Sequence, residues 1–77
     1  MGEAKPWAVF GKVLKELRTQ RRLSQAKLAE KARLDQRTVS MLERGESQPT
    51  LPTLYRLSGA LEVSLMDLIG KIDGGVK

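Results

Sequence analysis

Apolar residues recur at helical spacing along almost the whole chain, and no stretch alternates between apolar and polar residues as a half-buried strand would. A chain of 77 residues is near the lower size limit of a domain that folds without disulfide bonds or bound metal ions. It contains no Cys and no His, so neither a disulfide bond nor a zinc site of the usual kind can stabilise it. The sequence therefore predicts one all-α domain, held together by apolar burial between short helices.

Residue types that begin and end helices divide the chain into five helical segments. Ser24, Asp35 and Ser64 are suitable N-cap residues for the second, third and fifth segments. Gly45 and Gly70 suit the positions at which the third and fifth segments end. The first, second, third and fifth expected helices span about residues 8–21, 25–32, 36–44 and 64–69, and the fourth starts after Thr50 and buries Leu54, Leu57 and Leu61. The chain thereby divides into a flexible N-terminal arm, a domain, and a C-terminal tail or linker start, at residues 1–7, 8–70 and 71–77.

Basic residues are concentrated in the N-terminal half of the chain. The net charge is +5, and residues 12–44 carry ten basic and four acidic side chains, a net charge of +6. The rest of the chain is close to neutral, at −1. A basic half favours a polyanionic partner such as nucleic acid, although a solvated charged surface is a common alternative when charge is the only evidence.

The expected helix at residues 36–44 carries polar side chains on one side and apolar side chains on the other. At about 100° per residue, its polar arc is formed by Gln36, Arg37, Ser40 and Arg44. Val39 and Leu42 fall opposite, and Met41 flanks the polar arc. Only three residues separate this helix from the preceding one, so the two must cross steeply and leave the polar arc protruding. Gln can read adenine and Arg can read guanine in the major groove of DNA, whereas an isolated amphipathic helix would simply be solvated.

A resemblance to a known family extends over roughly residues 10–69. The residues that carry it lie at the start and inside of the second helix and inside and at the end of the third: Gln25, Leu28-Ala29, Val39, Leu42 and Glu43-x-Gly45. With the Leu61-x-Val63 ending of the fourth helix, the combination resembles the helix-turn-helix domain of the phage-repressor and Cro family, also called the XRE family. The resemblance implies a compact five-helix repressor-like fold, a helix-turn-helix formed by the second and third helices, and binding to double-stranded DNA.

The resemblance also implies roles for individual residues. Base contacts are implied for Gln36, Arg37, Ser40 and Met41. Contacts with the DNA backbone are implied for Gln25, Thr38 and Arg44, and Arg33, where the family usually has Gly, would add a cation that faces a phosphate. Arg18 and Glu43 would form the family's partly buried ion pair between the first and third helices. Three residues have simpler alternatives: Gln25 as the first residue of a helix, Met41 as part of the core or of a dimer surface, and Arg44 as a cation that complements a helix C-terminus.

The sequence departs from the family pattern at four positions. Arg22 and Arg33 stand in turns where the family usually has Gly, and a left-handed non-Gly residue there costs on the order of 1 kcal/mol. Asp35 and Glu46 place negative charge where relatives often have neutral or basic residues near the phosphates. These acids argue against backbone contacts from the helix cap and the following loop, but they leave the reading face intact.

The function that these residues predict is regulation of transcription by a homodimer that binds a palindromic operator sequence-specifically. One domain of this size contacts too few base pairs for discrimination within a genome, and two copies on a two-fold axis solve that problem. The dimer surface is expected at the fifth helix, where four apolar residues exceed what one short helix can bury: Leu65, Met66, Leu68 and Ile69.

Two alternatives keep the same domain but change its main partner or its context. In the first, the domain is an antitoxin or a coactivator-type adaptor, and its protein partner is a toxin or the transcription machinery. In the second, it is the DNA-binding part of a longer repressor, and Gly74-Gly75 would suit the start of a linker.

No feature of the sequence indicates an enzyme. His and Cys are absent, acidic residues are scattered over the helices, and there is no Gly-rich phosphate loop, so we expect no catalytic residue, metal or cofactor. No apolar run approaches the roughly 18 residues of a membrane span. We therefore expect no membrane association and a cytoplasmic, DNA-associated protein of the bacterial or phage type.

Overall fold

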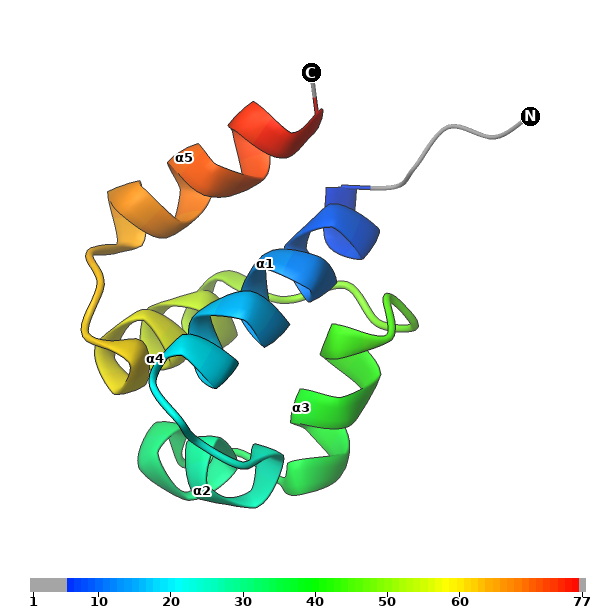
Figure 1. Cartoon of the computed structure of the whole chain (residues 1–77). Helices are drawn as coiled ribbons and strands as arrows, with labels where there is room; N and C mark the ends of the chain where they lie inside the picture. The colour runs from blue at the N-terminus through cyan, green and yellow to red at the C-terminus, as the bar shows by residue number, and fades with distance from the viewer. Residues whose placement is uncertain (1–5, 77) are drawn as a thin grey trace.

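Five helices and no strands make up the described part of the chain (Figure 1). The computed structural model describes the backbone of residues 6–76 and the side-chain environments of residues 7–71. The helices, in chain order, are α1 (Pro6–Gln20), α2 (Gln25–Ala32), α3 (Gln36–Glu43), α4 (Leu51–Leu61) and α5 (Leu65–Val76). The predicted all-α class, with a helix-turn-helix formed by α2 and α3, is confirmed.

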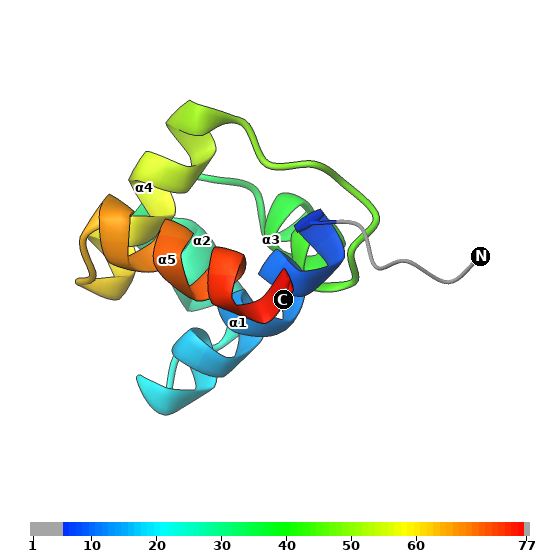
Figure 2. The same ribbon diagram turned by 90° about the horizontal axis from the view of Figure 1, so that it is seen from above.

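Helix α1 is central to the arrangement, because it packs against both α3 and α5. Helix α2 packs against α3 and α4, and α4 also contacts α5. Figure 1 shows α5 and α2 at opposite ends of the domain, and Figure 2 shows the connection after α3 running along one edge to α4. The helix-turn-helix therefore rests on α1 and α4, with α3 at the rim of the domain.

The apolar core draws on every helix. Its largest fully buried side chains, each less than 2% exposed, are Phe10, Leu14, Leu28, Val39, Leu42, Leu57, Leu61 and Leu68. Helices α2 and α3 have eight residues each, too few for either to be stable alone in water. Their stability must therefore come from the core that they share with α1 and α4.

Hydroxyl side chains cap three of the helices at their N-termini. The side-chain oxygens of Ser24, Thr50 and Ser64 each accept a hydrogen bond from the backbone N–H three residues later, at 3.0, 3.3 and 3.0 Å. Asp35 has the extended backbone of an N-cap residue at the start of α3, but its carboxylate accepts no capping hydrogen bond. The predicted cap positions Ser24, Asp35 and Ser64 are thus confirmed, whereas the cap at Thr50 was not predicted and α3 begins without a side-chain cap.

Helix α5 is longer than the sequence indicated. We expected it to end at Gly70 and a tail to follow, and this was wrong, because the helix continues to Val76. A glycine typically ends a helix by adopting a left-handed conformation. Gly45 does so after α3, with a φ of 73°, whereas Gly70 keeps a helical backbone.

Helix α1 begins earlier than predicted, at Pro6 instead of residue 8. Proline fits the first turn of a helix, because the N–H that it lacks would have no partner within the helix there. Two residues of the expected N-terminal arm, Pro6 and Trp7, therefore belong to α1. The rest of that arm, residues 1–5, and Lys77 of the expected tail lie outside the described residues.

Within residues 6–76, three turns contain a non-Gly residue in the left-handed region of φ. Arg22, Arg33 and Glu62 have φ values of 57°, 59° and 60° and follow the ends of α1, α2 and α4. Each is followed by a residue whose backbone N–H bonds back to a carbonyl of the helix just ended, at 2.8–3.1 Å. The two arginine positions were foreseen as departures from glycine, and Glu62 was not. Each such residue costs roughly 1–2 kcal/mol, which the surrounding fold must offset.

Candidate nucleic-acid interface

Helix α3 turns one side into the core and the other outward. Val39 and Leu42 are fully buried against the rest of the core. Gln36 and Arg37, at the N-terminal end, are exposed. The remaining candidate reading residues, Ser40 and Met41, are half-buried, as is Thr38. The open part of α3 is therefore its first turn, which carries Gln36 and Arg37, two of the four residues expected to contact bases.

The C-terminal end of α3 lies directly against the backbone of α1. A Cβ atom at Gly11 would come within 2.5 Å of the carbonyl oxygen of Leu42 and within 2.7 Å of that of Glu43. Gly45 makes a second close approach, because a Cβ there would lie 3.2 Å from the Cα of Ala8. Sequence reasoning missed Gly11, although an isolated glycine inside a helical pattern is a signal of such contacts.

Four residues form a hydrogen-bonded network where α1, α2 and α3 meet. Arg18 donates to the Glu43 carboxylate from Nε at 2.6 Å and from Nη2 at 3.1 Å. Gln25 Nε2 donates to the same carboxylate at 3.0 Å, and Arg18 Nη1 donates to the carbonyl oxygen of Leu23 at 2.7 Å. The Arg18 and Glu43 side chains are only 12% and 3% exposed. The structure thus brings the predicted ion-pair partners together and adds Gln25 to them.

The electrostatics of this network keep Arg18 charged. Hydrogen bonding to Glu43 and the charge of that carboxylate raise the pKa of the Arg18 guanidinium, against the lowering effect of burial. Three N–H donors converge on the Glu43 carboxylate, so this nearly buried anion is well compensated. The network fixes the C-terminal end of α3 and the N-terminal end of α2 to α1. It also holds the Gln25 side chain in one place.

The two cations that were predicted to contact the DNA backbone, Arg33 and Arg44, lie on the surface. Arg44 follows α3 and donates to Glu46 at 3.0 Å, and the two side chains are 58% and 52% exposed. A pair this exposed is worth no more than about 1 kcal/mol and is readily exchanged for another partner. Arg33 is exposed in the turn between α2 and α3. Neither cation is locked into the protein, so each can bind an anion from outside.

The apolar surface expected on the fifth helix is smaller than predicted, because one of its four residues is in the core. Leu68 is fully buried, so its place in the dimer surface was wrong. Met66 and Ile69 are 77% and 40% exposed, and Leu65 is half-buried. Sequence reasoning also missed an apolar surface on α4, where two large side chains, Leu51 and Tyr55, are 63% and 69% exposed.

The described residues contain neither a cluster of acidic metal ligands nor a long apolar helix. No three acidic side chains there lie close enough together to hold a metal ion, and the chain has neither His nor Cys. Between residues 6 and 76, no helix has both the length and the apolar character needed to cross a membrane.

Comparison with known proteins identifies the family of this chain. The family model described as Helix-turn-helix, HTH_3, matches residues 14–68. The chain belongs to the HTH_3 helix-turn-helix family. The resemblance inferred from the sequence is thereby confirmed, and the matched segment contains α2, α3 and α4 in full.

Two curated relatives of this HTH_3 protein are similar to it over most of its length. It is 36% identical over 61 residues to the Immunity repressor protein of Bacillus phage phi105, a match that covers 79% of this chain and 42% of the repressor. The chain therefore spans less than half the length of that relative. It is also 36% identical over 65 residues to an uncharacterized HTH-type transcriptional regulator, y4dJ, of Sinorhizobium fredii, covering 84% of each chain.

Solved structures of transcriptional regulators share the fold. The restriction-modification controller protein C.AhdI from Aeromonas hydrophila is 37% identical, with a TM-score of 0.78 over 80% of this chain and 94% of that one. The clp gene regulator ClgR from Corynebacterium glutamicum is 25% identical, with a TM-score of 0.90 over 99% of this chain and 97% of that one. The helix-turn-helix of this chain is therefore shared with a phage immunity repressor, a restriction-modification controller protein and a clp gene regulator.

Proposed function

We propose that the protein binds a palindromic DNA operator as a homodimer, with α3 in the major groove of each half-site, and thereby controls transcription. The observation that supports this most is the division of α3 into a buried C-terminal end and an exposed first turn. An α-helix fits the major groove of B-DNA and can present its first turn to the base edges. We also propose that the protein is located with the DNA in the cytoplasm of a bacterial cell.

The base-reading residues are those of the outward side of α3. Gln36 suits adenine and Arg37 suits guanine, because each side chain can make two hydrogen bonds to the respective base edge. Ser40 can hydrogen-bond to several bases, and Met41 offers an apolar contact to a thymine methyl group. Gln36 and Arg37 are the more exposed of the four, so we assign most of the sequence discrimination to them.

The DNA backbone is contacted by residues on both sides of α3. Arg33 precedes the helix and Arg44 follows it, so two cations lie near its two ends. Thr38 adds a hydroxyl group from within the helix. Gln25 is held by Glu43 through one N–H of its amide, which leaves the second N–H to donate to a phosphate oxygen. Glu43 is in this sense a positioning residue for Gln25.

Dimerisation is supported by the apolar residues that remain exposed on α4 and α5. Met66 and Ile69 on α5 and Leu51 on α4 are exposed and Leu65 is half-buried, so these residues suit the self-complementary surface that a two-fold axis requires. Two copies on such an axis place their α3 helices in major grooves one helical turn apart, about 34 Å.

Selection of bound duplexes from a random DNA library at near-physiological salt tests the proposal. We expect an enriched palindromic motif with half-site centres about one helical turn, 10–10.5 bp, apart. A single unrepeated half-site would show that the protein reads DNA as a monomer. If no motif were enriched and only salt-sensitive binding remained, the base-reading role of α3 would be refuted, and an adaptor that serves a toxin or the transcription machinery would replace it.

The dimer itself is tested by Met66→Glu, which places a charge on the exposed part of α5 without touching the core. Sedimentation should show a shift from dimer to monomer at micromolar concentration. Gln20→Glu is the matched control, because it adds the same charge at an exposed position at the end of α1. If both variants remain dimeric, the dimer surface lies elsewhere.

The size of the phage relative favours one specific context for this domain. Because the match covers 42% of the Immunity repressor protein, a domain of this kind occurs there as part of a longer chain. A longer repressor built around this domain remains the second candidate. In that case the residues outside the domain would strengthen dimerisation, and the operator contacts proposed for α3 would be unchanged.

A further inference from the structure

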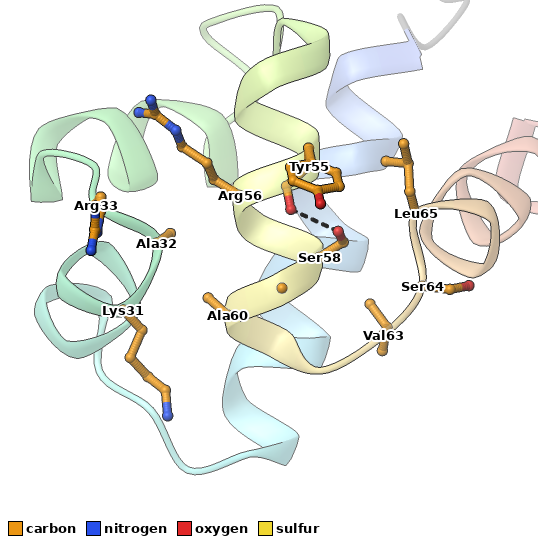
Figure 3. Close-up of a pocket in the computed structure, with 11 residues that line it drawn as sticks. Lys31, Ala32, Arg33, Tyr55, Arg56, Ser58, Ala60, Val63, Ser64 and Leu65 are labelled. Atoms are coloured by element: carbon orange, nitrogen blue, oxygen red, sulfur yellow. Dashed lines mark hydrogen bonds between the residues drawn. The ribbon is translucent and has the colours of Figure 1, made fainter.

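A groove crosses α4 and includes Arg33 of the turn between α2 and α3. It has a volume of about 420 Å³ and runs from the C-terminal end of α2 to the turn between α4 and α5. Figure 3 shows Arg56 extending from α4 toward the turn that carries Arg33, while Tyr55 lies on the side of α4 nearer Leu65. The two walls of the groove thus differ in chemistry, one being basic and the other largely apolar.

The floor of the groove is low because α4 has small residues where it faces the groove. Ser58, Gly59 and Ala60 follow one another there, and the Ser58 hydroxyl is turned inward to donate to the carbonyl oxygen of Tyr55 at 2.8 Å. A Cβ atom at Gly59 would meet no other atom within 4 Å. A glycine inside an exposed helix costs about 1 kcal/mol relative to alanine, and the packing of this chain gives no reason for it. A second chain that crosses α4 closely at Gly59 would be a reason for a glycine at this position.

The basic wall carries charges that the protein does not neutralise. Lys31, Arg33 and Arg56 line the groove and are exposed, and within residues 7–71 none of them forms an ion pair. No acidic side chain lines the groove. Three uncompensated cations beside an apolar strip complement a segment that carries both carboxylates and apolar side chains.

We infer that this groove binds an acidic, amphipathic segment of a partner protein. Its carboxylates would pair with Lys31 and Arg56, since Arg33 is assigned to the DNA backbone, and its apolar side chains would lie against Ala60 and Val63 over the low floor at Gly59. A DNA backbone would satisfy the cations but would leave the apolar wall without a contact, so a protein segment fits the groove better. The DNA-reading first turn of α3 stays open while the segment is bound.

Peptide selection tests this inference directly. A display library of random short peptides is selected on the immobilised protein, and the enriched peptides are synthesised with a fluorescent label. We expect them to combine Asp or Glu with Leu or aromatic residues. Gly59→Leu fills the groove while improving helix propensity, so it should weaken peptide binding by about tenfold or more without unfolding the protein. Arg56→Glu should weaken binding to a similar extent.

Matched controls separate the groove from general effects of charge and helix stability. Gly70→Leu makes the same replacement at another exposed helical glycine outside the groove, and Lys15→Glu makes the same charge change on α1. Both should bind the peptides like the parent protein. The inference is overturned if no acidic motif is enriched, or if the controls lose binding as much as the groove variants.

Two other occupants of the groove would give different results. If Gly59→Leu abolished dimerisation in sedimentation, the occupant would be a second copy of the chain, and the inference of a foreign partner would be wrong. If Arg56→Glu lowered DNA affinity at all salt concentrations and peptide binding was absent, the basic wall would belong to the DNA contact. Peptide binding that persists in the presence of operator DNA would support separate sites.

Discussion

The two ends of α3 differ in how firmly the protein holds them. At the C-terminal end, the Glu43 side chain is 3% exposed and accepts three hydrogen bonds, and the last carbonyl groups lie against the backbone of Gly11. At the N-terminal end, Asp35 makes no side-chain cap, and Gln36 and Arg37 are exposed. The contacts that stabilise the fold and the two most exposed of the proposed base-reading side chains therefore lie at opposite ends of one eight-residue helix.

This difference separates two kinds of substitution. Changes at the anchored end should lower the stability of the whole domain, because they remove burial or compensated charge. Changes at the open end should leave stability within about 0.5 kcal/mol and act on the choice of DNA sequence.

Leu42→Ala should be the most damaging change, because this side chain is 1% exposed in the centre of the core. Truncation of such a leucine costs about 2–5 kcal/mol, the transfer free energy plus that of the cavity left behind. In a domain of this size the melting temperature should fall by roughly 10 °C or more, as thermal unfolding followed by circular dichroism would show. An unchanged melting temperature would mean that α3 does not turn this side inward.

Glu43→Gln should lower both stability and DNA affinity. The amide keeps the size of the carboxylate but loses the charge that Arg18 and Gln25 bind, at a cost of about 1.5–3 kcal/mol in the free energy of unfolding. Because Gln25 is no longer held for its phosphate contact, affinity should fall equally for operator and random DNA in fluorescence anisotropy. A loss confined to the operator would instead give Glu43 a role in reading bases.

Gly11→Ala should push α1 and α3 apart. The new Cβ would lie within 2.5 Å of a backbone carbonyl oxygen, which cannot rotate away as a side chain could. Overpacking of this kind costs about 1–3 kcal/mol in urea unfolding. Gly70→Ala serves as the control, because the same change in open space should stabilise the protein by up to about 1 kcal/mol. Equal effects at the two positions would contradict the close approach at Gly11.

Arg37→Ala should leave the melting temperature unchanged and relax the preference at one or two base pairs of each half-site. The expected loss is about 1–3 kcal/mol of discrimination, measured as the ratio of operator to mismatched-operator affinity at fixed salt. Arg44→Ala is the comparison, since a phosphate contact should weaken binding to all sequences alike. If Arg37→Ala behaved in the same way, Arg37 would be a backbone contact as well.

Arg33→Gly should have only a small effect on the stability of the fold, opposite in sign to the changes at Leu42, Glu43 and Gly11. Glycine adopts the left-handed conformation at this position without strain, so stability should rise by up to about 1 kcal/mol. The lost cation should at the same time reduce the slope of log affinity against log salt by about one. A salt dependence equal to that of the parent protein would show that Arg33 does not contact the DNA backbone.

The sequence predicted α2 and α3 well because local chemistry defines both helices. Ser24 caps α2, Gly45 turns the chain after α3, and the spacing of Val39 and Leu42 sets the buried side. Helix α5 was harder to predict, because only the backbone conformation shows that Gly70 does not end the helix.

Contacts between distant residues were the other limit of sequence reasoning. The burial of Leu68 depends on how α5 packs against α1 and α4, which no local pattern contains. The same holds for the approach of Gly11 to the end of α3 and for the hydrogen bond from Gln25 to Glu43. The Arg18–Glu43 pair was expected only through the family resemblance, since 25 residues separate the two in the chain.

The brevity of α2 and α3 links DNA recognition to the cooperativity of the whole domain. A peptide of residues 24–45 would contain every proposed base-reading residue, yet two eight-residue helices without α1 and α4 cannot persist in water. Operator binding should therefore disappear at the same denaturant midpoint as global folding. By linkage, operator at 100 times its dissociation constant should raise the unfolding free energy of the entire domain by about 2.7 kcal/mol. Occupancy of the operator would then protect even α5, which has no contact with DNA in the proposed complex, from thermal unfolding.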